Sequence, residues 1–202
     1  TGCGGGSDAA GQSSAAGGPT SAAALSANII VTADSNQVSS KGAFQPVTAY
    51  LSRSSRVMKS AGDGQSEATF STSIATPGYY QVYVWWPQIA PGAGQVDVTV
   101  HHGCGTTVTT VDQSILGGQW NSVGTYLMNT GSAAVDIADR RGTVAYADAV
   151  RFAYVGNSAP VLAIGATELP LAEDAATYAA TLDVTGGVAP YTLSVSKGVL
   201  PA

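Results

Sequence analysis

The sequence predicts an all-β protein, an antiparallel, jelly-roll-like β-sandwich, on three observations. Between residues 28 and 154, apolar and β-branched or aromatic residues alternate with polar ones in short runs, as in strands with one buried face. Turn residues, mostly Gly and Pro, separate these runs at even intervals. The runs lack the 3.6-residue apolar spacing that indicates a helix, so the pattern favours a sandwich.

The clearest strand is expected over residues 79–86, where Pro77-Gly78 opens the run and Pro87 ends it. Alternation divides its side chains between two faces. One face carries Tyr80, Val82, Val84 and Trp86, and the other carries Tyr79, Gln81, Tyr83 and Trp85. Further strands are expected over residues 28–31, 67–73, 96–100, 106–111, 124–128 and 135–137.

The last strand of this unit is expected over residues 144–154, with Asp148 on the same face as its apolar side chains. An unpaired charge in that position is costly. We therefore expect Asp148 to be a structural carboxylate that meets backbone N–H groups, Arg141, Arg151 or a cation.

Composition and motifs exclude several classes of function. The formal net charge is -5 with no basic cluster, so nucleic acid is not an expected partner. No apolar run is long enough for a transmembrane helix. The chain has two histidines and no Gly-x-Ser-x-Gly motif, and we expect neither an enzyme nor a cofactor. His101 and His102 point to opposite faces of a strand and cannot chelate one ion there, so no metal site is expected.

Residues 1–26 consist mostly of Gly, Ser, Ala and Thr and are expected to form a flexible tether. The start, Thr1-Gly2-Cys3 followed by three glycines, is typical of the junction between a signal peptide and a bacterial lipoprotein. We therefore expect a secreted or cell-surface protein. Three fates of Cys3 stay open: a lipid anchor, a disulfide with Cys104 within one chain or between neighbouring chains, and a free thiol.

Residues 157–202 are expected to form a linker and an incomplete β unit. Alternating apolar residues over 178–184 and 191–195 flank a Gly186-Gly187 turn. Two or three strands do not make a stable domain alone. Something must therefore complete this unit.

Several motifs in a fixed order resemble golvesin-like domains, which are also described at the C-terminus of xanthan lyases. The resemblance covers about residues 28–156 and leaves the domains 1–26, 27–156 and 157–202. Its motifs are Pro77-Gly78-Tyr79-Tyr80-Gln81-Val82-Tyr83-Val84-Trp85-Trp86-Pro87, Val98 to Gly103, Val111-Asp112-Gln113, Gly118-Gln119-Trp120-Asn121, Gly124-Thr125-Tyr126 and Ala147 to Phe152. The tail is similar to bacterial Ig-like repeats. This resemblance implies an accessory carbohydrate-associated or adhesive module.

Two functional hypotheses follow. In the first, a non-catalytic extracellular module binds a surface polysaccharide or matrix polymer through an exposed aromatic face, since such faces stack on sugars or contact proteins. The candidate binding residues are Tyr79, Tyr83, Trp85 and Trp120, with Gln81 and Asn121 beside them. Burial of this face against another element is the alternative. In the second hypothesis, the chain is a subunit of a filament or surface array in which copies join through the N-terminal arm and the incomplete C-terminal unit.

Overall fold

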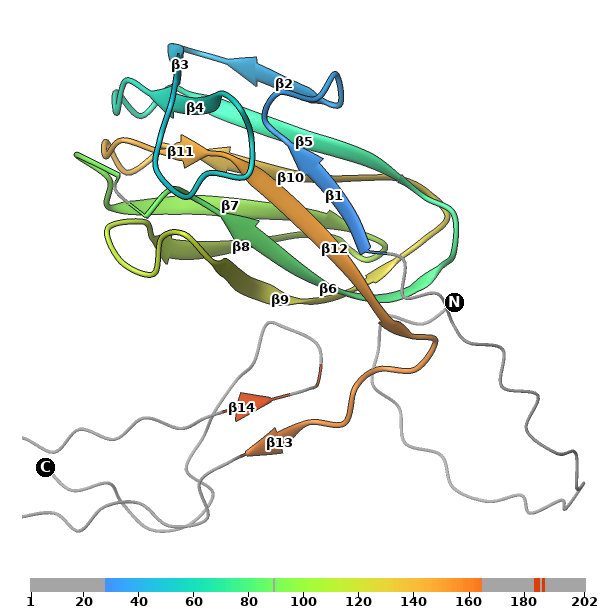
Figure 1. Ribbon diagram of the computed structural model, residues 1–202. Coiled ribbons are helices and arrows are strands. Elements are labelled where there is room, and N and C mark those ends of the chain that lie inside the picture. Colours follow the sequence, from blue (N-terminus) through green and yellow to red (C-terminus); the bar gives the residue numbers. More distant parts are fainter. Residues whose placement is uncertain (1–27, 89, 165–183, 186, 188–202) are drawn as a thin grey trace, which may run out of the picture.

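The computed structural model describes residues 28–88, 90–164, 184, 185 and 187, and every regular element in this part of the chain is a β-strand (Figure 1). All pairings between these strands are antiparallel. The predicted all-β class is therefore confirmed. None of the described segments is a helix of the length and apolarity needed to cross a bilayer.

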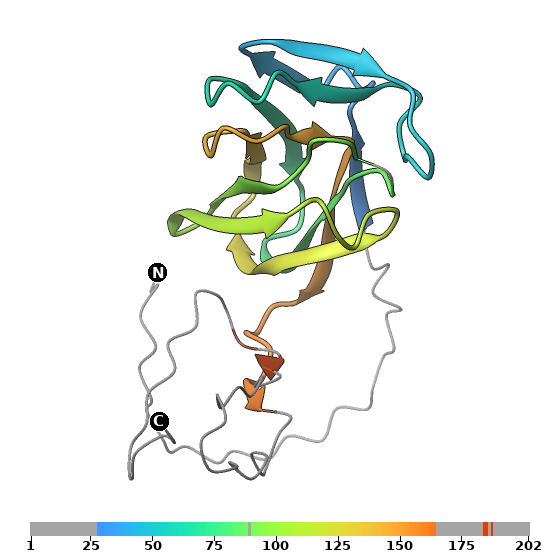
Figure 2. The same cartoon turned by 90° about the vertical axis from the view of Figure 1, so that its left-hand side faces the viewer.

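Two main sheets pack face to face, and a smaller sheet covers one end (Figure 2). The four-stranded sheet has the order β1 (Asn28–Thr32), β12 (Ala149–Gly156), β6 (Gly78–Trp85), β9 (Trp120–Met128). The five-stranded sheet has the order β2 (Val38–Lys41), β5 (Glu67–Ile74), β10 (Gly131–Ala138), β7 (Gln95–His102), β8 (Gly105–Asp112). The end sheet consists of β11 (Tyr146–Ala147), β4 (Val57–Ser60) and β3 (Phe44–Val47).

The core lies between the two main sheets and follows the alternation of the sequence. On β6 the face with Tyr80, Val82, Val84 and Trp86 is buried, as is the valine row of β7. The largest fully buried side chains include Tyr80, Trp86, Phe70, Phe152, Tyr126 and Ile74. Because each such side chain contributes about 1.5–3 kcal/mol when removed from water, this packing fixes which face of β6 turns to solvent.

The predicted strand over residues 144–154 needs a correction. Asp148 separates two shorter strands, which belong to different sheets. β11 belongs to the end sheet, and β12 belongs to the four-stranded sheet. Asp148 is fully buried between them. Its carboxylate takes hydrogen bonds from another loop, described below, and so cannot continue the apolar face that the alternation suggested.

Several expectations fall on residues outside the described ones. The tether over 1–26, Cys3 with its possible lipid, and most of the Ig-like unit lie there. Cys104 is disulfide-bonded, but its pairing with Cys3 stays a prediction for this reason. Of the C-terminal unit, the structure describes β13 (Ala163–Ile164) and β14 (Val184–Thr185), which pair with each other. The domain limits also stay predictions.

Candidate functional site

Two tryptophan side chains meet on the solvent side of the four-stranded sheet. Trp85 at the end of β6 and Trp120 at the start of β9 are register partners. Their ring centroids are 5.3 Å apart in an edge-to-face arrangement. Both are half-buried, because the neighbouring Val84 and Trp86 take the inner positions of β6. The pair therefore offers aromatic surface to solvent.

Two arginines lie over these rings. The Cζ atom of Arg53 is 5.2 Å from the centre of Trp85 and 5.3 Å from that of Trp120. The Cζ atom of Arg151 is 4.0 Å from the centre of Tyr83 and 4.9 Å from that of Trp120. These distances are those of cation–π contacts. We call these five residues the aromatic–arginine face.

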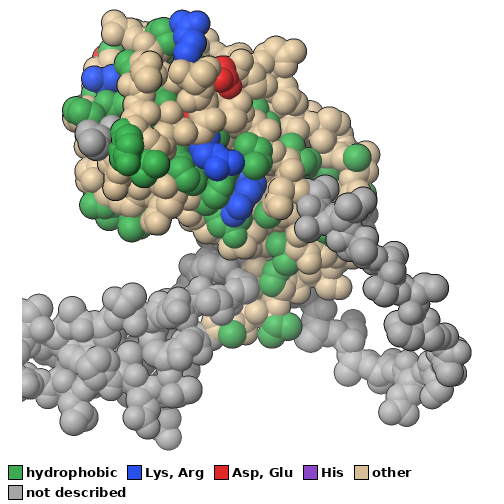
Figure 3. All heavy atoms as spheres, viewed as in Figure 1, with side chains coloured by type: hydrophobic (Ala, Val, Ile, Leu, Met, Phe, Trp, Pro, Cys, Tyr) green, Lys and Arg blue, Asp and Glu red, His purple; other side chains and the backbone are tan. Residues whose placement is uncertain are grey.

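Strand register positions Arg151. It lies on β12 directly opposite Tyr83 on β6. Its neighbours Val150 and Phe152 are fully buried, so alternation turns Arg151 to the outer side of the sheet. Figure 3 shows basic side chains among hydrophobic ones over the four-stranded sheet. The sheet therefore presents a basic and aromatic surface to solvent.

Two carboxylates hold the loop that carries Arg53. The backbone N–H groups of Arg53 and Ser54 donate to Asp148 at 2.9 and 2.8 Å, and the Ser54 hydroxyl donates to it at 2.6 Å. The backbone N–H and hydroxyl of Ser55 donate to Asp34 at 2.9 and 2.7 Å. Three successive backbone N–H groups are thus bound, which fixes the position of Arg53 above the tryptophans.

The pKa values of the two carboxylates are shifted in opposite directions. Hydrogen bonds from the hydroxyl of Thr32 and from Ser55 lower the pKa of Asp34 from 3.8 to about 2. Burial raises the pKa of Asp148, and the hydrogen bonds from Ser54 and Arg53 partly oppose this rise. These hydrogen bonds therefore stabilise the ionised form of Asp148 against the cost of its burial.

A second loop, residues 113–119, borders the tryptophan pair. The indole N–H of Trp86 donates to the carbonyl of Ile115 at 3.0 Å, and the N–H of Gly118 donates to the carbonyl of Trp86 at 2.9 Å. Gly117 lies so close to Pro87 that a Cβ atom would stand 2.2 Å from its carbonyl oxygen. Only glycine fits there. The loop is therefore fixed to the end of β6.

The two loops meet beside the tryptophans and expose apolar side chains. In both views segment 48–56 lies close to segment 113–119 (Figures 1 and 2). Leu51 and Leu116 have positive φ values of 52° and 55° and are 45% and 60% exposed. Tyr50 and Ile115 are also exposed, and the indole N–H of Trp85 donates to the carbonyl of Leu51 at 2.8 Å. Strained backbone and exposed apolar groups often mark functional sites.

Comparison with known proteins identifies the family. Residues 28–154 match the model of the Golvesin C-terminal domain. The chain belongs to that family. A xanthan lyase of Bacillus sp. (strain GL1) is 40% identical over 101 residues, which are 48% of this chain and 11% of that protein. The structure of Paenibacillus xanthan lyase matches with 31% identity and a TM-score of 0.58, over 64% of this chain and 13% of that one.

A third comparison concerns the fold alone. The structure of a Podospora anserina mannanase, described as GH26-CBM35, matches this golvesin C-terminal domain with a TM-score of 0.50 at 18% identity. The match covers 66% of this chain and 29% of that one. The chain thus spans about a tenth to a third of these relatives' lengths.

The golvesin domain brings together part of the predicted binding set. Tyr83, Trp85 and Trp120 are together, and the amide of Gln81 donates to the Ser122 hydroxyl at 3.2 Å on the same side of the sheet. Tyr79 pairs with Leu127 at the other end of β6, away from the tryptophans.

Asn121 binds the loop next to the tryptophan pair. It pairs with Val84, and its amide donates to the carbonyls of Leu116 and Gln119, both at 3.0 Å. The Asn121 side chain therefore stabilises the 113–119 loop, which borders the tryptophan pair.

Arg53 and Arg151 are the residues that sequence reasoning missed. Alternation around the buried Val150 and Phe152 could have placed Arg151 on the outer face. No periodic signal marked Arg53, because the loop that carries it is held by residues distant in sequence.

The two histidines considered for metal binding, and two carboxylates elsewhere in the domain, each have separate partners. His101 contacts Asp136 at 2.7 Å, and His102 contacts the Thr107 hydroxyl at 3.0 Å. Asp139 accepts hydrogen bonds from the N–H groups of Gly62 and Ser66, while Asp112 accepts from Ser114. In the described part of the chain, no three potential metal ligands gather.

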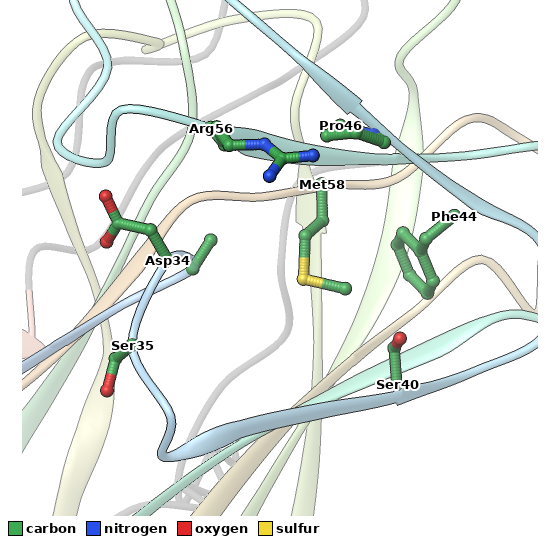
Figure 4. Close-up of a pocket in the computed structure, with 8 residues that line it drawn as sticks. Asp34, Ser35, Ser40, Phe44, Pro46, Arg56 and Met58 are labelled. Atoms are coloured by element: carbon green, nitrogen blue, oxygen red, sulfur yellow. The ribbon is translucent and has the colours of Figure 1, made fainter.

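A pocket of about 370 Å³ lies apart from this face, between the β1–β2 turn, β2, β3 and β4 (Figure 4). Met58 and Phe44 point into it, with Asp34 and Arg56 on one side. Asp34 already accepts hydrogen bonds from Ser55. The pocket lacks a pair of tryptophan rings, so we place the candidate site on the aromatic–arginine face.

Proposed function

We propose that this golvesin C-terminal domain is a non-catalytic carbohydrate-binding module, secreted or at the cell surface, that binds a polysaccharide on its aromatic–arginine face. One observation carries the proposal. Trp85 and Trp120 lie 5.3 Å apart on the solvent side of the sheet, between two loops with exposed apolar side chains. Half-exposed aromatic rings combine an apolar surface for stacking with a polar edge.

The relatives support a role as an accessory part of proteins that act on polysaccharides. Two are named as xanthan lyases, and the matched part is 11% and 13% of their chains. A segment of that size fits an accessory unit of a larger protein. The filament hypothesis gains no support from the comparisons, and the segments it depends on lie mostly outside the described residues.

The chemistry of the face favours binding over catalysis. Its charged groups are two guanidinium groups, which supply hydrogen-bond donors in a fixed planar arrangement but no acceptor atom. The carboxylates nearest to it in the loop network, Asp34 and Asp148, are held by hydrogen bonds to backbone and serine groups. They therefore serve to position the loop.

The test compares Trp120→Ala with the wild type in affinity gel electrophoresis over xanthan and a panel of neutral polysaccharides. Removal of a central aromatic contact is expected to weaken binding by at least about 10-fold. Val108→Ala is the matched control, because Val108 is 59% exposed on β8 of the opposite sheet. Equal retention of all three proteins on every binding polymer would refute the proposal.

A further inference from the structure

We propose that the aromatic–arginine face selects acidic polysaccharides, and that Arg53 and Arg151 bind the carboxylate of a uronic acid whose ring contacts the exposed aromatic surface of Trp85 and Trp120. This inference rests on the proposed function, because it names the class of polymer for the same face.

Neither guanidinium group donates a hydrogen bond to, or forms an ion pair with, any residue that the structure describes. By contrast, three basic side chains beside the five-stranded sheet are ion-paired: Lys41 and Arg140 with Glu67, and Arg141 with Asp97. The chain has more acidic than basic residues, 13 against 8. Acidic partners are thus not scarce, yet this face holds its two arginines without one.

One nitrogen atom of Arg151 also lacks a hydrogen-bond acceptor. Its Nε is buried from solvent and has no hydrogen-bond partner among the described residues. Buried donors nearly always have a partner. The ring of Tyr83, 4.0 Å from Cζ, supports the flat side of the guanidinium group but accepts no conventional hydrogen bond. An anion bound to the guanidinium group of Arg151 would compensate for the incomplete solvation of that group.

Asp148 does not serve as the acid for Arg53. Arg53 lowers the pKa of Asp148 by charge attraction, but this is the smallest contribution to that pKa. The carboxylate is fully buried, and both of its oxygens already accept hydrogen bonds from the backbone of Arg53 and from Ser54. The guanidinium group of Arg53 therefore stays available on the surface.

The geometry around Trp120 suits a sugar acid. The centre of its ring is 5.3 Å from one guanidinium carbon and 4.9 Å from the other. One sugar ring over Trp120 would thus face two like charges, and an anion between them would offset their mutual repulsion. The planar fork of arginine matches a carboxylate in a bidentate manner. A neutral sugar would leave both charges uncompensated.

The experiment measures binding of the full chain to polygalacturonate, alginate and polyglucuronate, each before and after chemical reduction of its carboxyl groups. Dextran sulfate serves as an anionic polymer without carboxylates. We expect at least one uronate polymer to bind, and its carboxyl-reduced form and dextran sulfate to bind at least about 10-fold more weakly. Because a charge-assisted contact is lost, Arg151→Gln and Arg53→Gln should each weaken uronate binding about 10- to 100-fold.

Two further variants make the result specific. Lys41→Gln removes the same charge from the opposite sheet, where its side chain is 64% exposed and Glu67 keeps Arg140, and it should bind as the wild type does. Arg151→Lys keeps the charge without the fork and should still lose affinity. Circular dichroism checks that each variant is folded.

The outcomes separate this inference from the proposed function. Binding of neutral or carboxyl-reduced polymers that depends on Trp120 but not on the arginines would overturn the inference and leave the proposed function intact. Equal binding of dextran sulfate would also overturn it, by showing recognition of charge alone. If no polymer binds, or if Trp120→Ala changes nothing, both fail.

Discussion

Replacing Asp148 with Asn removes the charge that binds the Arg53 loop while it keeps the shape of the side chain. An Asn oxygen can still accept from the N–H and hydroxyl of Ser54, but its NH2 group then faces the N–H of Arg53, which now donates to Asp148 at 2.9 Å. A hydrogen bond to a charged group contributes about 1.5–3 kcal/mol, and an unsatisfied buried donor costs about 1–3 kcal/mol. The relief of burying a charge offsets part of this loss.

We therefore expect Asp148→Asn to lower the free energy of unfolding at pH 7 by about 2–3 kcal/mol, and Tm by roughly 10 °C. Urea titration followed by tryptophan fluorescence measures the change. Asp112→Asn is the control, since Asp112 accepts the same two kinds of donor from Ser114 but is exposed, and its midpoint should not move. A variant within about 0.5 kcal/mol of the wild type would refute the role of this carboxylate.

Two further predictions concern the loops around the site. Gly117→Ala would place a Cβ atom 2.2 Å from the carbonyl oxygen of Pro87. The substitution should therefore destabilise the domain by about 1–3 kcal/mol and weaken polysaccharide binding in gel-retardation assays. Unchanged stability and binding would show that the loop can move away freely. Asp34 has a pKa of about 2 in the folded chain against the ordinary 3.8, so the unfolded state binds more protons between these values and the stabilisation is lost as pH falls through about 2. The urea midpoint of Asp34→Asn should accordingly fall less steeply than that of the wild type between about pH 4 and pH 2, and parallel curves would contradict this.

The sequence allowed the strands and their faces to be predicted where alternation is strong. Over residues 79–86 and 96–100, valine and aromatic side chains recur at every second position, and burial follows that pattern. The short strands β2 and β3 were not predicted. Both lie at sheet edges, and β3 contains Pro46. Their pairing comes from neighbouring strands and not from local composition.

The site could be predicted only in part, for a physical reason. Tyr83, Trp85 and Trp120 lie on strands, so periodicity indicates the side on which they stand. The orientation of Arg53 depends on hydrogen bonds to Asp34 and Asp148, which are 21 and 94 residues away from their partners Ser55 and Ser54. Contacts of this kind have no signature in a single sequence.

The position of Asp148 between β11 and β12 links the proposed binding surface to a buried junction of two sheets. The same residue joins β11 to β12 and binds the Arg53 loop, so that loop cannot open without releasing a junction between two sheets. The amide hydrogens of Arg53 and Ser54, which donate to Asp148, should exchange with solvent as slowly as those of the core, because their release requires this junction to open. For the proposed function, this means a preorganised surface that loses little conformational entropy when a ligand binds.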